Sequence, residues 1–381
     1  MYNRAHPTYF FLAFILIGLL SLYVFINQNN HIANVVPSEA PIQAKNETED
    51  NPKPLLKNAS ADVYDLKDFN VRTFKGYISL NELNEEVYQP LGYEITKPTL
   101  PIPSIRMLKE PTCDETFSEW IKVAQLEQPE VPPIQLPIIH ADEYLMNNYA
   151  ALSWGYMNNH THHEKKPTNW YRFAELMKFS KTDLANLEYG VESESIYNAM
   201  SAYSVNGKSG LIIGSMQPWL EIMALQNGAA KILTVEHYEL KIPDAFQDRL
   251  TDIRPMDFAT NWKKYAGTFD FAATFSNIQH MGLGRFGDPL DAMGDLREML
   301  KIRCMLKEGG LLFLGIPMGT DALQYNVQRI YGSLRLSMMF YGYEWLATYS
   351  HIALTPITLT SKVLNPDLFR SQHFTVVLKK I

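Results

Sequence analysis

The chain has 381 residues, of which 46% are hydrophobic, so it is long enough to form one large domain and a smaller one. Its formal net charge is −7 and it contains no run of lysine or arginine, which argues against a nucleic-acid partner bound through its phosphates. The two cysteines, Cys113 and Cys304, exclude a disulfide framework, and Cys304 falls on the apolar face of a predicted helix. We therefore expect buried free thiols rather than a bridge between them.

Residues 9–26 form an uncharged run of eighteen residues, which is at the short end of what crosses a bilayer as a helix. Arg4 precedes this run, and the next lysine or arginine is Lys45. This distribution predicts a signal anchor, with residues 1–8 in the cytoplasm and the rest of a single-pass type II membrane protein in the lumen of the endoplasmic reticulum or Golgi. The alternative is a cleaved signal peptide, but the run is longer than the apolar part of most signal peptides and no small-residue cleavage site follows it.

Residues 27–61 are rich in Asn, Pro, Glu, Ala and Lys and lack apolar periodicity, which is typical of a flexible, disordered stem. Acceptor sequons for N-glycosylation begin at Asn46 and Asn58 in this stem and at Asn159 in a later polar loop. Glycans at these positions would agree with a lumenal location.

Residues 62–190 combine Pro-rich connectors with short helical patches that carry aromatic side chains, so we expect a mainly helical accessory region. Residues 160–164 contain three histidines and a glutamate in a polar loop. Such histidines are more often solvated than bound to a metal ion, and we predict no metal site.

From residue 191 to residue 381 strands and helices alternate, which predicts an α/β domain with a mostly parallel, Rossmann-like sheet. The apolar run 209–214 predicts the first strand, and Pro218 opens the helix that follows. The second predicted strand, residues 231–235, ends at Glu236. Since parallel strands end at one rim, where the next helix directs free N–H groups outward, Glu236 is placed to accept both ribose hydroxyls of a nucleoside.

The remaining elements follow from the same signals. Apolar runs predict strands, the periodicity of apolar residues predicts helices, and glycine marks their ends. The predicted elements are a helix over residues 219–226, a strand over 269–275, a helix over 294–306, a strand over 311–315 after the glycine pair 309–310, and a closing hairpin of residues 343–349 and 374–379.

The order of these elements resembles that of Rossmann-like S-adenosylmethionine-dependent methyltransferases, whose sheet ends in an antiparallel hairpin. The chain is more closely similar to the nematode-rich "domain of unknown function 268" family over about residues 190–381. This closer resemblance rests on four motifs, at residues 214–219, 282–290, 294–296 and 309–315.

The resemblance implies S-adenosylmethionine as the cofactor, bound at the rim of the sheet. The cofactor-binding residues assigned in this way are Gly214, Ser215, Pro218, Glu236, Asp257 and Ser276. Asp257 corresponds to the place where such folds often contact the adenine amino group. The first loop departs from the family pattern, because methyltransferases usually carry an acid and two or three glycines there, whereas Gly214 is followed here by Ser-Met-Gln. The loop is therefore either re-routed around Pro218 or binds the cofactor less tightly.

The loop after residue 275 emerges at the same rim and carries the candidate catalytic residues. Methyl transfer to a hydroxyl needs the oxygen to be positioned and relieved of its proton, and His280 is suited to this near neutral pH. Asp288 is assigned to catalysis beside it, and Arg285 and Asp295 are assigned to binding a polar acceptor. The alternative is structural: His280 caps a helix, and Arg285 pairs with Asp288 to shape the loop.

The predicted function is methyl transfer from S-adenosylmethionine to a hydroxyl acceptor, such as a glycan, in the lumen of the secretory pathway. Two alternatives stay open. A stem-tethered lumenal domain is also typical of Golgi glycosyltransferases, but the chain has no Asp-x-Asp pair of the kind that holds a metal ion and a nucleotide diphosphate. The other alternative is a binding protein that has kept the fold and lost the cofactor.

Overall fold

The computed structural model describes residues 64–126, 131–159, 168–364 and 367–381. The predicted membrane anchor, the stem, and the sequons at Asn46 and Asn58 lie outside these residues. Within the described ranges, no helix is long and apolar enough to cross a membrane. The segment Asp62–Ile381 forms one compact unit, so the accessory region and the α/β domain pack together.

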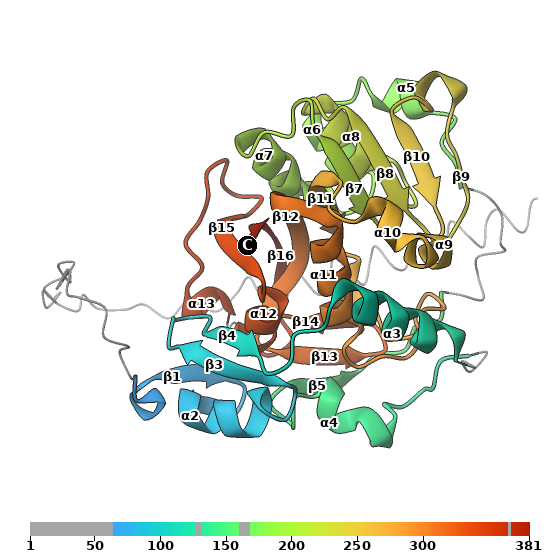
Figure 1. Ribbon diagram of the computed structural model, residues 1–381. Helices are drawn as coiled ribbons and strands as arrows, with labels where there is room; N and C mark the ends of the chain where they lie inside the picture. The colour runs from blue at the N-terminus through green and yellow to red at the C-terminus, as the bar shows by residue number, and fades with distance from the viewer. Residues whose placement is uncertain (1–63, 127–130, 160–167, 365–366) are drawn as a thin grey trace, which may run out of the picture. The chain divides into compact units, whose positions relative to one another are not determined.

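The centre of this unit is a seven-stranded sheet (Figure 1). In spatial order its strands are β10 (Leu250–Ile253), β8 (Lys231–Val235), β7 (Ser209–Ile213), β11 (Phe269–Phe275), β12 (Leu306–Gly319), β16 (Ser371–Lys380) and β15 (Tyr343–Tyr349). The strands from β10 to β12 run parallel, and β16 runs antiparallel to both of its neighbours. Numbered along the chain, the order is 3-2-1-4-5-7-6. This confirms the predicted methyltransferase-like sheet, mostly parallel with an antiparallel last strand.

The strand order reverses at β7, which has β8 on one side and β11 on the other. At such a point the connections leave toward opposite faces of the sheet, and a crevice for ligands forms at the carboxyl ends of the strands. β7 and β11 are almost wholly buried, as expected of parallel strands that are covered on both faces. Leu211 and Ile213 pack into the core on one face, and Ile212 packs into the core on the other.

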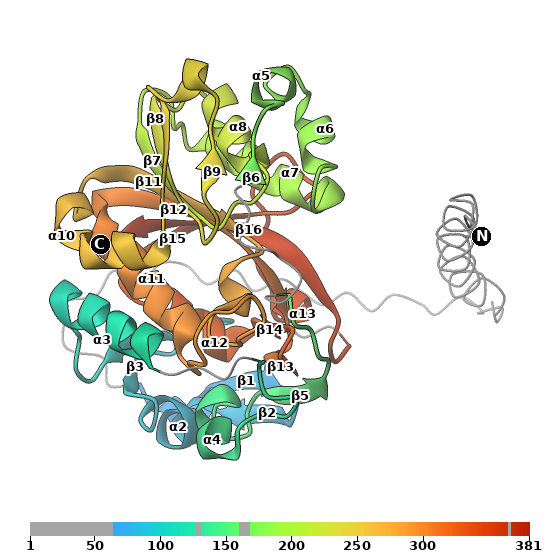
Figure 2. The ribbon, with the colours of Figure 1, turned by 90° about the vertical axis from the view of Figure 1, so that its right-hand side faces the viewer.

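Helices cover both faces of the sheet (Figures 1 and 2). α7 and α8 share a hydrophobic core with Ile212, whereas α9 and α11 share one with Leu211. α8 follows Pro218 and is buried on nearly every side, so its sequence is apolar almost throughout. The helices of the domain are α7 (Glu194–Ala202), α8 (Trp219–Gln226), α9 (Pro255–Thr260), α10 (Trp262–Tyr265), α11 (Gly294–Met305), α12 (Ser333–Met339) and α13 (Ser361–Leu364).

The accessory region contains strands as well as the predicted helices. β1 pairs with β2 and β3 with β4 in antiparallel hairpins, while β5 and β6 pair with β13 and β9 of the α/β domain. The bounds are β1 (Asn70–Thr73), β2 (Gly76–Ser79), α2 (Leu80–Leu83), β3 (Tyr93–Lys97), β4 (Ser104–Met107), α3 (Cys113–Gln125), α4 (Ala141–Tyr144), β5 (Ala151–Trp154), β6 (Thr168–Asn169), α5 (Phe173–Leu176), α6 (Lys181–Ala185), β9 (Leu240–Lys241), β13 (Ala322–Tyr325) and β14 (Gln328–Ile330).

A disulfide joins Cys113 to Cys304, with their Cα atoms 5.8 Å apart. This contradicts the expectation of free buried thiols. Cys113 begins α3 and Cys304 lies in the last turn of α11, and these two helices pack side by side (Figure 2). The cysteines are 191 residues apart in the sequence, so only the packing of the two helices brings them together.

β12 begins earlier than predicted. α11 passes directly into the strand at Leu306, and the strand continues through Gly309 and Gly310. The register with β11 shifts between Phe269 and Phe271, and Gly309 has a φ of 71°. The glycine pair therefore forms an irregularity inside the strand rather than its start, because glycine tolerates this backbone conformation without strain.

Candidate active site

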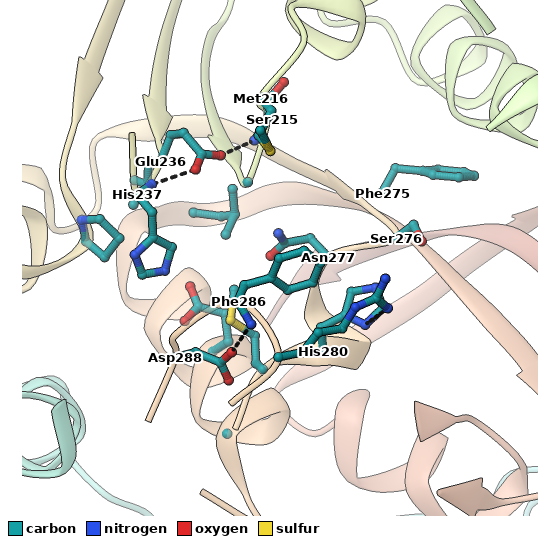
Figure 3. Close-up of a pocket in the computed structure, with 18 of the residues that line it drawn as sticks. Ser215, Met216, Glu236, His237, Phe275, Ser276, Asn277, His280, Phe286 and Asp288 are labelled. Atoms are coloured by element: carbon teal, nitrogen blue, oxygen red, sulfur yellow. Dashed lines mark hydrogen bonds between the residues drawn. The ribbon is translucent and has the colours of Figure 1, made fainter. Parts of the chain in front are cut away.

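A cavity of about 590 Å³ lies at the carboxyl ends of β7, β8 and β11 (Figure 3). Sites for cofactor-sized ligands typically have volumes of about 300–1,000 Å³. Figure 3 shows Ser215 and Glu236 on one side of the cavity and His280 and Asp288 on the other. The residues of the sequence prediction that line the cavity are Asn159, Gly214, Ser215, Glu236, Ser276, His280, Arg285 and Asp288.

Glu236 directly follows β8 and so stands at the tip of the second strand, as predicted. Both of its carboxylate oxygens accept backbone N–H groups. The N–H of Ser215 lies 2.8 Å from Oε2, and the N–H of His237 lies 2.7 Å from Oε1 (Figure 3). Each carboxylate oxygen has two acceptor sites, so each keeps capacity for one further hydrogen bond. Glu236 thus fixes the first loop of the sheet and still fits the two ribose hydroxyls that the sequence assigns to it.

Gly214 needs to be glycine for two reasons. Its φ is 70°, in the left-handed region, and a Cβ at this position would lie 2.0 Å from Nδ2 of Asn277. Asn277 also lines the cavity, so its side chain packs against the backbone where a cofactor would approach the first loop.

Glu221, a buried residue of α8, completes this loop and had no signal in the sequence. Its carboxyl accepts the hydroxyl of Ser215 at 2.7 Å and that of Thr234 at 2.8 Å. Burial raises the pKa of Glu221 to about 7. α8 is apolar on all sides and therefore has no polar face. The periodicity of its sequence could not show whether Glu221 is buried or exposed.

Two residues assigned to the cofactor do not line the cavity. Pro218 is the N-cap of α8, and Asp257 is exposed on α9. The proposed contact of Asp257 with adenine does not fit this position. Pro255, at the start of the same helix, lines the cavity instead, and Arg254 donates to the carbonyl of Glu236 at 2.6 Å.

Asp288 organises the glycine-rich loop. Its Oδ2 accepts the N–H groups of Gly282, Leu283 and Gly284 at 2.7, 3.0 and 3.2 Å, and its Oδ1 accepts that of Phe286 at 3.3 Å. Burial outweighs these hydrogen bonds and raises the pKa of Asp288. A carboxylate engaged by so many amides shapes a loop rather than transferring protons, so the assignment of Asp288 to catalysis does not fit. The structural alternative, in which Arg285 pairs with Asp288 to shape the loop, is thus only partly correct. Asp288 shapes the loop through backbone amides and not through Arg285.

Asp295, assigned to substrate binding, is completely buried and away from the cavity. Arg335 contacts both of its oxygens, at 2.5 and 3.1 Å, and the hydroxyl of Tyr331 donates to Oδ2 at 3.1 Å. Burial opposes ionisation, but Arg329 and Arg335 outweigh it and hold the pKa of Asp295 below its ordinary value. Asp295 is therefore corrected to a structural residue, since no acceptor molecule can reach it.

This buried cluster supports the loop from the inside. Arg329 donates to the carbonyls of Met281 and Ala292, and Arg335 also donates to that of Ala292. The side chains that hold the loop thus come from β14 and α12, which follow the loop in the sequence. Asp295 forms ion pairs with both of these guanidinium groups.

His280 lies at the end of a short 3₁₀ helix, Ile278–His280, and faces the cavity. Its Nδ1 is 2.7 Å from the carbonyl oxygen of Val327, so Nδ1 carries the proton and Nε2 keeps its lone pair. Burial and the neighbouring Arg285 lower the pKa of His280 to about 3. The imidazole is therefore neutral at physiological pH and too weakly basic to take a proton efficiently, in contrast to the premise of the sequence prediction.

Arg285 and Asn159 form one wall of the cavity. The Nε of Arg285 donates to Oδ1 of Asn159 at 3.2 Å, and its Nη1 donates to the carbonyl of Val327 at 3.2 Å. The side-chain amide of Asn159 is thus engaged in the cavity wall rather than free on an outer surface. Among the described residues, no group of three or more His, Cys, Asp or Glu side chains is arranged to hold a metal ion.

Ser276 immediately follows β11, has a φ of 52°, and lines the cavity as predicted. Its hydroxyl lies 3.1 Å from Nε2 of His373, whose Nδ1 lies 3.2 Å from Oε2 of Glu192. No local sequence pattern indicates these partners, because His373 lies 97 residues from Ser276 and 181 residues from Glu192 along the chain.

Solved structures are similar to this chain over about half of its length. A "putative hemolysin" from Streptococcus thermophilus has 17% identity and a TM-score of 0.31, and the match covers 49% of this chain and 64% of that one, less than two thirds of its length. A 1,6-didemethyltoxoflavin-N1-methyltransferase from Burkholderia thailandensis has 10% identity and a TM-score of 0.36, with 55% and 90% covered. A "putative S-adenosylmethionine dependent methyltransferase" from Listeria monocytogenes has 10% identity and a TM-score of 0.33, with 50% and 100% covered. No curated protein matches the chain.

A family model matches residues 207–381, and its description is "Caenorhabditis protein of unknown function, DUF268". The matched span includes all four motifs on which the resemblance rests and most of the cavity, including the glycine-rich loop. The predicted resemblance to this family is therefore confirmed over residues 207–381.

Proposed function

We propose that the protein is an S-adenosylmethionine-dependent methyltransferase whose acceptor is a hydroxyl group, such as one on a glycan. The observation that carries the proposal is the position of Glu236, which directly follows β8, lines the same cavity as Gly214, and keeps acceptor capacity on both carboxylate oxygens. The cofactor, when bound, supplies an activated methyl group. Glu236 would accept hydrogen bonds from its two ribose hydroxyls, beside the loop at Gly214.

The acceptor side of the cavity is formed by His280 and Arg285. We assign His280 to orienting the acceptor rather than to general-base catalysis, because its pKa of about 3 leaves it neutral and weakly basic. With the Nδ1 proton held by Val327, Nε2 is free to accept the acceptor's hydroxyl proton in a hydrogen bond. This interaction aims an oxygen lone pair at the methyl group.

Titration calorimetry of the purified chain with S-adenosylmethionine tests the proposal. We expect the parent protein to bind and Glu236→Ala to bind more weakly by about 1.5–3 kcal/mol, tenfold or more, because two ribose hydroxyls lose a charged acceptor. Glu236→Gln keeps one acceptor oxygen for an N–H group of the first loop but loses the charge. Weaker binding in this variant therefore reports on the cofactor rather than on loss of the fold.

Asp257→Ala is the matched control, since Asp257 is an exposed acid on the neighbouring helix and does not line the cavity. Its affinity should equal that of the parent. A parent protein that is folded but does not bind S-adenosylmethionine would instead favour a binding protein that has lost the cofactor. Equal affinity in the parent and in Glu236→Ala would show that Glu236 serves only the loop.

We further propose that the described unit lies in the lumen of the secretory pathway, anchored by residues 9–26. The Cys113–Cys304 disulfide supports this, because such bonds persist in oxidising compartments and are rare in the cytosol. The charge pattern around residues 9–26 and the sequons at Asn46 and Asn58 agree with it.

Glycosidase digestion of membrane fractions tests this topology. The parent protein should resist carbonate extraction and shift in electrophoretic mobility on digestion, and the shift should disappear in the double variant Asn46→Gln, Asn58→Gln. Asn159→Gln should leave the mobility unchanged, because Asn159 lies in the cavity wall and pairs with Arg285. If digestion does not shift the mobility of the protein and carbonate extracts it from the membranes, the proposed location is wrong.

A further inference from the structure

Ser276 sits in a backbone conformation that is rare for its residue type. It follows the last residue of β11, and its φ of 52° lies in the left-handed region, which non-glycine residues seldom adopt. Strained residues of this kind gather at functional sites, where the surrounding structure holds them. The sharp turn after a strand presents the Ser276 side chain at the wall of the cavity (Figure 3).

The hydroxyl of Ser276 is directed at a histidine. Nε2 of Gln279 donates to Oγ of Ser276 at 2.6 Å. With a donor already placed on its oxygen, Ser276 has its own proton available for Nε2 of His373, 3.1 Å away. The ring of His373 is stacked on Phe275, with centroids 5.4 Å apart, which fixes its orientation.

A carboxylate holds the histidine from the other side. Oε2 of Glu192 lies 3.2 Å from Nδ1 of His373, so Nδ1 carries the ring proton and Nε2 presents a lone pair to Ser276. The hydrogen bond from His373 lowers the pKa of Glu192, which keeps this carboxylate ionised at neutral pH. Two successive contacts thus link a hydroxyl, an imidazole and a carboxylate that come from three separate parts of the chain.

We propose that Ser276, His373 and Glu192 form a nucleophilic triad, and that the cavity carries an acyl-transfer activity toward small esters, beyond the proposed methyl transfer. Triads are recognised by this geometry and not by sequence order or fold. Ser276 is the nucleophile, His373 is the base and acid, and Glu192 is a positioning residue that acts through His373.

The reaction follows from these roles. Oγ of Ser276 bonds to the ester carbonyl carbon while its proton passes to Nε2 of His373. The bond from that carbon to the alcohol oxygen then breaks, and the leaving alcohol takes the proton from His373. Water then bonds to the acyl carbon while its proton passes to the same Nε2, the bond from that carbon to Oγ breaks, and His373 returns the proton to Ser276 as the carboxylic acid is released. The amide N–H of Asn277, the first after the serine, is the position from which such turns supply an oxyanion donor.

A fluorophosphonate probe tests the triad on the full chain in detergent, without any cofactor. We expect covalent labelling of Ser276, identified by peptide mass spectrometry on the parent protein, and hydrolysis of p-nitrophenyl acetate above background. Ser276→Ala should abolish both, and His373→Gln should slow labelling by about a hundredfold or more. Because the site is mapped on the parent, the test does not depend on whether a variant folds.

Two further variants separate catalysis from folding. Glu192→Gln should slow labelling by about tenfold or more, and Glu192→Asp should recover part of that loss, which a merely structural role would not produce. Ser201→Ala changes an exposed serine of α7 and should label at the parental rate. A folded parent whose Ser276 remains unlabelled, or labelling that persists in Ser276→Ala, would overturn the proposal.

Discussion

Replacing Asp295 with alanine is expected to destabilise the protein by about 3–5 kcal/mol, because it leaves two buried guanidinium groups without their counter-charge. Asp295 is fully buried, and Arg329 and Arg335 are each 3% exposed, so water cannot replace the missing carboxylate. The two arginines also hold carbonyls of the glycine-rich loop, so the loop should loosen as well. Urea unfolding monitored by circular dichroism measures the loss in free energy of unfolding. Asp295→Asn keeps the shape of the side chain and removes only its charge, so it shows how much of the loss comes from the charge.

Asp367→Ala is the matched control. Asp367 pairs with Arg370 at 3.1 Å, but the two side chains are 80% and 75% exposed. Exposed pairs contribute about 0–1 kcal/mol, so this variant should unfold close to the parent. If Asp295→Ala unfolds as the control does, the buried cluster is not what stabilises this part of the molecule.

The Asp295 ion pairs also predict a dependence of stability on pH. The pKa of Asp295 in the folded protein is below its ordinary value of 3.8, so the unfolded chain binds the proton more readily. The stabilisation from the ionised Asp295 carboxylate is therefore fully present above pH 3.8. It is lost as the pH falls through the pKa that Asp295 has in the folded protein, which lies below 3.8. Unfolding of the parent should show this loss in acid, and that of Asp295→Asn should not.

His280→Gln is expected to lower turnover by about a hundredfold, the lower end of the 10²–10⁴ range for groups that assist proton transfer. The lower end applies because a histidine with a pKa of about 3 positions the acceptor and does not remove its proton. Cofactor affinity should stay nearly constant, since the change lies on the acceptor side of the cavity. Release of S-adenosylhomocysteine with a panel of sugar acceptors measures the turnover, and calorimetry measures the affinity.

The pH profile distinguishes the two roles of His280. A base with an ordinary pKa would give a rise in turnover near pH 6.5, whereas a histidine that stays neutral gives no step of its own above about pH 5. His140→Gln, which changes an exposed histidine of the accessory region, should keep parental turnover. Full turnover in His280→Gln would leave His280 with a structural role in the loop.

Local sequence signals predicted the parallel part of the sheet closely. The runs at residues 209–214, 231–235 and 269–275 became β7, β8 and β11, because a strand buried on both faces must be apolar throughout. Proline before α8 and glycine after it marked that helix correctly, since these residues act on the backbone next to them. The start of β12 was missed because a bulge at Gly309 depends on the neighbouring strand.

The same logic explains which site residues the sequence could find. Gly214, Glu236 and Ser276 each follow a strand, and parallel strands bring all their carboxyl ends to one rim, so these three line the cavity. Asp257 and Asp295 lie on helices, where the face that a side chain occupies decides its role. Spacing along the chain could not show that one is exposed and the other fully buried.

The sequence by itself therefore determined the sheet, its rim and the residues at the strand ends, because these depend on local propensity and on the parallel arrangement of strands. Only the tertiary structure decided the contacts between distant segments. Packing of α3 on α11 pairs Cys113 with Cys304, and packing of β16 beside β12 carries His373 to Ser276. Such contacts join elements far apart in the chain, and no local pattern encodes which distant side chain will fill the space beside a given one.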